Sequence, residues 1–85
     1  MSAGYVYILQ CVDGTLYTGV TKDVAVRLAA HNAGRGAKYT RGWRPVRLAY
    51  VEVVSDRSRA LAREQAIKRL PAARKRALIV SCGMV

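Results

Sequence analysis

The chain has little cysteine and no long apolar run. Its 85 residues include two cysteines, Cys11 and Cys82, without the paired spacing of a zinc site. No stretch approaches the ~18 apolar residues of a membrane span, and residues 1–10 lack a charged segment followed by an apolar one. We therefore expect reduced thiols, no disulfide-linked partner, no membrane partner and a cytoplasmic location.

Acidic residues are also scarce. Five Asp and Glu stand against fifteen Lys and Arg, which gives a net charge of +10, and most of the cations are arginine. This charge attracts polyanions, and arginine binds phosphate through two parallel hydrogen bonds. DNA is therefore the expected partner, with RNA as an alternative. A basic protein whose charge serves only solubility is the competing interpretation.

The length sets the domain organisation. With 85 residues and no repeat, linker or low-complexity tract, we expect one domain, 1–85, with a modest core. Such a domain has no room for a separate specificity module. The sequence leaves the oligomeric state open, with a monomer as one option.

Residues 5–21, YVYILQCVDGTLYTGVT, are typical of one β-hairpin. A two-residue turn would put Tyr7 and Tyr17 on opposite faces. A three-residue turn, 12–14, with Gly14 in the left-handed conformation, pairs Leu9 with Tyr17 and Tyr7 with Gly19, so both tyrosines share a face. We predict the second register because it gathers four apolar side chains on the other face, namely Val6, Ile8, Leu16 and Val20.

A helix is predicted after the hairpin. Thr21 or Asp23 is its N-cap, and it extends to Asn32 before Gly34 ends it. Helical periodicity places Val24 and Leu28 on an apolar stripe.

Arg27 and His31 lie one turn apart beside that stripe, and we expect both to face inward. A partly buried arginine requires an anionic partner, which favours a functional role for the pair. A core histidine with satisfied hydrogen bonds is the alternative for His31.

Residues 33–46, AGRGAKYTRGWRPV, follow neither a helical nor a strand period. A loop this long in a small domain is more often functional than idle, and cations combined with aromatic rings are typical of single-strand binding. An alternative is that the tryptophan covers the sheet. The candidate phosphate contacts are Arg35, Lys38, Arg41, Arg44 and Arg47, and the candidate stacking residues are Tyr39 and Trp43.

Arg47–Val54, RLAYVEVV, is predicted to be the third strand. The fold class is α/β (α+β), with a small three-stranded antiparallel sheet flanked by about three helices. Strict alternation assigns Leu48, Tyr50, Glu52 and Val54 to one face, and Ala49, Val51 and Val53 to the other.

A second helix is predicted to begin after Ser55 or Asp56 and to extend to Leu70. Pro71 then ends it or starts a further helix that runs toward Gly83.

Glu64 lies inside the apolar arc of the second helix rather than on its arginine-rich side. A buried ion pair with Arg27 or an i, i+4 pair with Lys68 would account for this position. A metal ligand is the sharper interpretation, because Mg²⁺ prefers hard oxygen donors. The apolar arc itself consists of Ala60, Leu61 and Ile67.

Taken together, the chain resembles the GIY-YIG nuclease superfamily, and within it the small single-domain bacterial, UPF0213-like group. Tyr5-Val6-Tyr7 stands where the family has its GIY motif, and Tyr17-Thr18-Gly19 where it has YIG. The stretch HNAGRGAKYTRGWRP is similar to the signature loop of the small group. Whether Tyr5 contributes to the site or packs stays open, because it replaces the first glycine of the motif. The residues that match the family's site are Tyr7, Tyr17, Arg27, His31 and Glu64.

The resemblance implies metal-dependent catalysis. Glu64 would hold one Mg²⁺ or Mn²⁺ ion together with waters, and the ion would polarise the scissile phosphate. Tyr7 would orient or deprotonate the attacking water, for which we expect its pKa of ~10 to be lowered by Arg27, His31 or the metal.

The remaining residues have supporting roles in this scheme. Tyr17 would position water or phosphate, and Arg27 would stabilise charge on the phosphoryl oxygens. His31 would relay a proton from the tyrosine, and Lys38 would add a phosphate contact.

The resulting hypothesis is a divalent-metal-dependent endonuclease that cleaves single-stranded or structured DNA with little sequence specificity. One alternative is a basic nucleic-acid-binding module with little or no cleavage activity, or one that acts on RNA. A structural protein with a satisfied polar network is a third. A role in DNA repair, restriction or mobile elements follows from the family by analogy alone.

Overall fold

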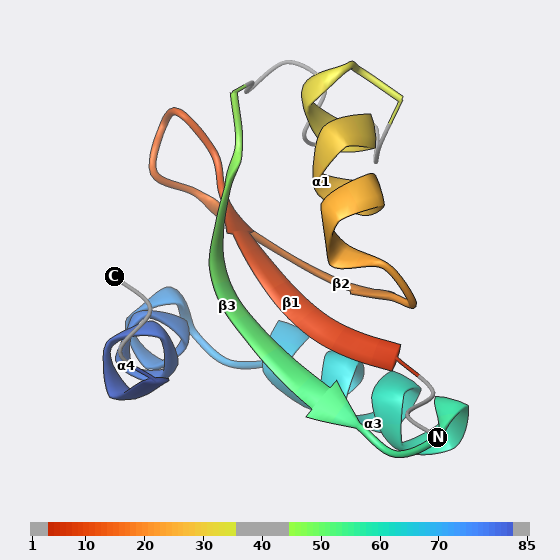
Figure 1. Ribbon diagram of the computed structural model, residues 1–85. Coiled ribbons are helices and arrows are strands. Elements are labelled where there is room, and N and C mark those ends of the chain that lie inside the picture. Colours follow the sequence, from red (N-terminus) through yellow and green to blue (C-terminus); the bar gives the residue numbers. More distant parts are fainter. Residues whose placement is uncertain (1–3, 36–44, 83–85) are drawn as a thin grey trace.

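The computed structural model describes residues 4–35 and 45–82 (Figure 1). The strands form one antiparallel sheet in the order β2-β1-β3. Figure 1 shows α1 on one face of the sheet and α3 on the other. This arrangement confirms the predicted three-stranded sheet with helices on both faces. In chain order, the elements are β1 Gly4–Gln10, β2 Leu16–Thr21, α1 Val24–Asn32, β3 Arg47–Val54, α3 Arg57–Lys68 and α4 Ala72–Cys82.

The hairpin has the predicted register. Tyr7 pairs with Gly19 and Leu9 with Tyr17, across the three-residue turn 12–14. Gly14 has a φ of 89°, in the left-handed region that glycine adopts without strain. The Asp13 carboxylate accepts hydrogen bonds from the Thr15 amide at 3.0 Å and from its hydroxyl at 2.6 Å, which fixes the turn.

The core consists of two layers because β1 is covered on both faces. The face toward α3 and α4 carries the larger cluster, and the face toward α1 carries a smaller one. Side chains on both faces of β1 are therefore buried among apolar residues, and this central strand contributes to both layers of the core. The larger cluster contains Val6, Ile8, Tyr50, Val54, Ala60 and Ile67, and the smaller one contains Tyr7, Leu9, Cys11 and Val46.

A bulge in β3 places Leu48 on a different face of the sheet from the one predicted. Ile8 pairs with Tyr50 but Leu9 pairs with Leu48, so Ala49 is an extra residue in this strand. The extra residue moves Leu48 to the α1 face, where it packs on the smaller cluster. The prediction that Leu48 shares a face with Tyr50 was wrong because it assumed strict alternation.

Aspartate caps begin α1 and α3. The carboxylate of Asp23 accepts from the Val26 amide at 3.1 Å, and that of Asp56 accepts from the Arg59 amide at 2.8 Å. The caps are therefore Asp23 and Asp56 rather than the Thr and Ser alternatives. In the described part of the chain, no helix has the length and apolar character needed to cross a membrane.

An ion pair joins α3 to β3. The Arg63 guanidinium donates to Glu52 of β3 at 2.9 Å, and the Tyr50 hydroxyl donates to the same carboxylate at 2.7 Å. Consecutive helical residues point about 100° apart, so Glu64 is turned away from β3. It faces the β2 side of the sheet, where the candidate site lies.

Candidate active site

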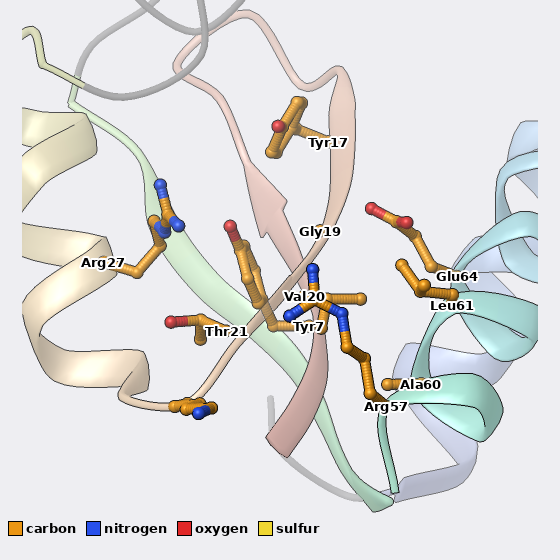
Figure 2. Close-up of a pocket in the computed structure, with 11 residues that line it drawn as sticks. Tyr7, Tyr17, Gly19, Val20, Thr21, Arg27, Arg57, Ala60, Leu61 and Glu64 are labelled. Carbon is orange, nitrogen blue, oxygen red and sulfur yellow. The ribbon is translucent and has the colours of Figure 1, made fainter. Parts of the chain in front are cut away.

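A cleft of about 750 Å³ opens at the free edge of β2, between α1 and α3 (Figure 2). Its walls come from both faces of the sheet, because β2 is an edge strand that neither helix covers completely. Figure 2 shows the Arg27 side chain on the α1 side and the Glu64 side chain on the α3 side. The lining residues used below are Tyr7, Tyr17, Gly19, Arg27, Arg57 and Glu64.

Gly19 allows Tyr7 to reach this edge. A Cβ atom at position 19 would lie 2.5 Å from the Tyr7 hydroxyl oxygen and 2.7 Å from Cζ. The tyrosine ring therefore lies directly over the glycine backbone, and any side chain there would displace it. The glycine of the second motif thus serves the tyrosine of the first.

Gly19→Ala is expected to lower, by about 10²-fold, the DNA cleavage that the family resemblance implies, because the Tyr7 hydroxyl must move. The overpacked ring should also cost about 1–3 kcal/mol of unfolding free energy. Cleavage rates measured below the melting temperature separate the two effects. Gly14→Ala, which strains the hairpin turn far from the cleft, is the matched control and should lower stability only; wild-type cleavage by Gly19→Ala would contradict the packing argument.

His31 lies behind Tyr7 and is 1% exposed. Its Nε2 is 3.3 Å from the Tyr7 hydroxyl, and its ring is tilted against the ring of Tyr17 at a centroid distance of 5.2 Å. Burial, and secondly repulsion from Arg27, lowers the pKa of His31 below 6.5. His31 is therefore neutral at pH 7, and in the tautomer with its proton on Nδ1 it accepts the Tyr7 hydrogen bond.

The direction of this pKa shift predicts a pH dependence of stability. Because the folded protein prefers neutral His31, its contribution is complete above pH 6.5 and is lost as the pH falls toward the lower folded pKa. Chemical denaturation of wild type and His31→Gln between pH 7.5 and 5 checks this. The stability difference between the two proteins should shrink on acidification, and a constant difference would contradict the prediction.

Tyr7 differs from the sequence expectation in its pKa. The side chain is 3% exposed, and burial, followed by repulsion from Tyr17, raises the pKa of Tyr7 to about 12. Arg27 lowers it, but by less than burial raises it. The net shift is therefore opposite to the expected lowering, because burial outweighs Arg27, which does act in the expected direction. Tyr7 thus carries its proton at neutral pH. The expected lowering by a metal stays a prediction.

Arg27 lines the cleft but is exposed, whereas His31 is buried. The prediction that both face inward together was wrong for Arg27. One turn of α1 separates them, and the cleft opens at the level of Arg27, so its guanidinium is available to a ligand.

Glu64 points into the cleft from α3, and its side chain is 14% exposed. Its carboxylate pairs with Lys68 at 3.4 Å, so of the two ion pairs considered from the sequence the structure contains the i, i+4 pair. Leu61, predicted to belong to the buried arc, is 46% exposed and lines the cleft beside Glu64. The apolar arc of α3 therefore ends where the cleft begins.

The oxygen donors of the cleft suit a hard divalent cation. Within residues 4–35 and 45–82, no three His, Cys, Asp or Glu side chains gather into a metal site. One carboxylate leaves most positions of an octahedral ion to waters and substrate, which is the usual state of protein-bound Mg²⁺. The Glu64 carboxylate already pairs with one cationic group, the Lys68 ammonium. The donor set therefore fits Mg²⁺ or Mn²⁺ and lacks the ligands of a closed structural site.

Other predicted contacts lie away from the cleft. Tyr5 lines a separate depression with Val24 and Leu48, and Arg35 is an exposed residue just beyond α1. Arg47 donates to Gln10 at 2.7 Å. Five predicted contacts, Lys38, Tyr39, Arg41, Trp43 and Arg44, fall outside the described residues.

Lys22 and Arg57 line the cleft but were not predicted as site residues. Arg57 is seven residues before Glu64, so the two lie on the same side of α3. This spacing was visible in the sequence, but a basic residue in an arginine-rich helix carries little information alone.

The sequence matches the family described as the GIY-YIG catalytic domain over residues 3–77. UPF0213 proteins are among its relatives. One from Desulfotalea psychrophila is 55% identical over 91% of this chain and 71% of the relative. Another from Halobacterium salinarum is 54% identical over 87% of this chain and 96% of the relative. The chain therefore belongs to the GIY-YIG family of nucleases, in its UPF0213 group.

Two solved structures support this assignment. The solution NMR structure of a UPF0213 protein from Bacillus halodurans has a TM-score of 0.58 and 43% identity, and covers 95% of this chain and 85% of the other. An NMR structure of a protein from E. faecalis has a TM-score of 0.64 and 36% identity, with coverages of 100% and 94%. The fold is thus shared with a UPF0213 protein and with the E. faecalis protein.

Proposed function

We propose that this protein is a divalent-metal-dependent endonuclease that hydrolyses phosphodiester bonds in single-stranded or structured DNA with little sequence specificity. The observation that carries the proposal is the Tyr7 hydroxyl, which bonds to neutral His31 and opens into the cleft that Arg27 and Glu64 line. A binding surface alone has no use for a buried proton acceptor behind such a hydroxyl.

The raised pKa of Tyr7 argues for a proton relay rather than a free tyrosinate. The Tyr7 oxygen accepts a hydrogen bond from the attacking water. As the water oxygen bonds to phosphorus, the bond from phosphorus to the leaving oxygen breaks. The water proton passes to Tyr7 while the Tyr7 proton passes to Nε2 of His31, which ends as imidazolium, and the leaving oxygen takes a proton from solvent. The relay requires neutral His31, in agreement with the direction of its pKa shift.

Two further residues act on the phosphate in this proposal. The Arg27 guanidinium stabilises the charge that develops on the non-bridging oxygens, and the Tyr17 hydroxyl positions the phosphate or water. Glu64 would hold Mg²⁺ or Mn²⁺, and the ion, when bound, would polarise the scissile phosphate and the leaving oxygen. The cations of the cleft, Lys22, Arg27 and Arg57, can bind phosphates, which every sequence shares, in agreement with low sequence specificity.

Incubation of single-stranded, duplex and branched DNA, and of the matching RNA, with Mg²⁺, Mn²⁺ or a chelator tests the proposal. We expect metal-dependent cleavage of single-stranded or branched DNA by the wild type and none by Glu64→Ala. Equal background cleavage by both proteins would make the catalytic proposal wrong. Salt-sensitive binding without cleavage would instead favour the binding-module alternative, which the Glu64–Lys68 ion pair also permits.

A further inference from the structure

Arg57 differs from the other basic residues of α3 in its partners. Arg59 pairs with Asp56 at 3.3 Å, Arg63 with Glu52 at 2.9 Å, and Lys68 with Glu64 at 3.4 Å. Among the ion pairs formed between described residues, none involves Arg57. Three of the four cations of this helix are thus neutralised by neighbouring carboxylates, and Arg57 is left available for another anion.

The position of Arg57 indicates where that anion would bind. Arg57 lines the cleft, and Figure 2 shows its side chain extending from the start of α3 toward Val20 of β2. Arg27 lines the same cleft from α1, on the other side of Tyr7 in this view. A strand that crosses the edge of β2 would therefore meet a guanidinium on each side of the reacting centre.

The spacing along α3 separates Arg57 from the metal ligand. Glu64 follows Arg57 by seven positions on one side of the helix, which places their Cα atoms about 10.5 Å apart along its axis. The cleft of about 750 Å³ is also larger than one phosphate group requires. Arg57 therefore lies at a second position in the cleft, apart from the carboxylate of Glu64, where another phosphate could bind.

The charges of the cleft agree with more than one bound phosphate. Three cations, Lys22, Arg27 and Arg57, line it together with one carboxylate, and a bound divalent ion would add to the positive excess. A single phosphodiester neutralises only one of these charges. We propose that Arg57 binds a second phosphate of the substrate strand, next to the scissile one, so that the cleft prefers polynucleotides to isolated phosphodiesters. The binding of a second phosphate by Arg57 does not depend on cleavage. Only the statement that the neighbouring phosphate is the one cleaved rests on the proposed function.

The first test measures binding of single-stranded oligothymidylate by fluorescence anisotropy across a salt series without added metal. Arg57→Ala should lower affinity about tenfold at low salt and reduce the slope of log affinity against log salt by about 0.7. Arg57→Lys should restore the slope, because the charge is kept. Arg59→Ala, a charge deletion on the same helical turn and outside the cleft, should retain the wild-type slope.

The second test measures cleavage of a thymidine dinucleotide with and without a terminal phosphate on either end. For wild type and Arg59→Ala, a phosphate on one end should raise kcat/KM at least about tenfold, and Arg57→Ala should lose most of that gain. A wild-type slope and an undiminished gain in Arg57→Ala would overturn the inference while leaving the nuclease proposal intact. A reduced slope in a protein that cleaves nothing would support Arg57 and refute the nuclease proposal, whereas absence of binding by the wild type would overturn the inference.

Discussion

Glu64→Gln is expected to lower metal-dependent DNA cleavage by at least about 10³-fold, because a cleft metal contributes several kcal/mol to stabilising the transition state. The substitution keeps the size of the side chain and removes its charge. Glu64 is the acidic residue that lines the cleft in the described part of the chain, so no neighbouring carboxylate there can replace it. The same variant should lose Mn²⁺ binding in a calorimetric titration, which is a measurement independent of activity.

Lys68→Ala is the matched control for this variant. Both substitutions break the Glu64–Lys68 ion pair, but only Glu64→Gln removes the carboxylate. Because Lys68 is substantially exposed, loss of the pair should change the unfolding free energy by no more than about 1 kcal/mol in either variant. Lys68→Ala should retain cleavage. A Glu64→Gln protein that melts much earlier and still cleaves would show that Glu64 has a structural role instead.

The hairpin register could be predicted from the sequence because two local requirements agree. Gly14 favours the left-handed backbone conformation at the end of a three-residue turn, and the same turn places the apolar residues of both strands on one face. A one-residue slip would expose that whole face to water. The turn conformation of Gly14 and the burial of the apolar face therefore require the same register, in which Tyr7 lies beside Gly19.

Leu48 and Leu61 show where periodicity is insufficient. Leu48 changes faces because Ala49 is an extra residue in β3, and a bulge leaves no clear signal in an eight-residue, mostly apolar strand. Leu61 belongs to the apolar stripe of α3, but this stripe extends beyond the edge of the sheet, because β2 is the edge strand. Periodicity gives the direction of a side chain and not the extent of the surface it meets.

The cleft itself illustrates the same limitation. The Tyr7 side chain lies on the α1 face of the sheet, whereas Glu64 comes from α3 on the other face, and their approach at the edge of β2 depends on how α3 packs on the sheet. The sign of the Tyr7 pKa shift likewise depends on how completely the chain covers its hydroxyl. The family motif predicted which residues belong together, whereas burial and electrostatics required the three-dimensional structure. The roles assigned to the basic loop stay predictions.

Tyr7→Phe is expected to lower DNA cleavage by about 10² to 10⁴-fold, the range contributed by general acid–base catalysis. The substitution keeps the buried ring over Gly19 and removes only the hydroxyl between the cleft and His31. Loss of one long hydrogen bond should change the unfolding free energy by about 1 kcal/mol. Single-turnover cleavage, with the protein in excess over labelled DNA, measures the chemical step without product release.

Tyr50→Phe provides the matched control, because it removes a tyrosine hydroxyl from the opposite face of the sheet. That hydroxyl donates to Glu52 at 2.7 Å, so its loss should affect stability at least as much as the loss at Tyr7 while cleavage continues. The neutral Tyr7 hydroxyl carries no charge to a phosphate, so Tyr7→Phe should bind DNA with the wild-type salt dependence. Intact binding with lost cleavage is the pattern that separates a proton relay from a binding module, and unchanged cleavage by Tyr7→Phe would refute the relay.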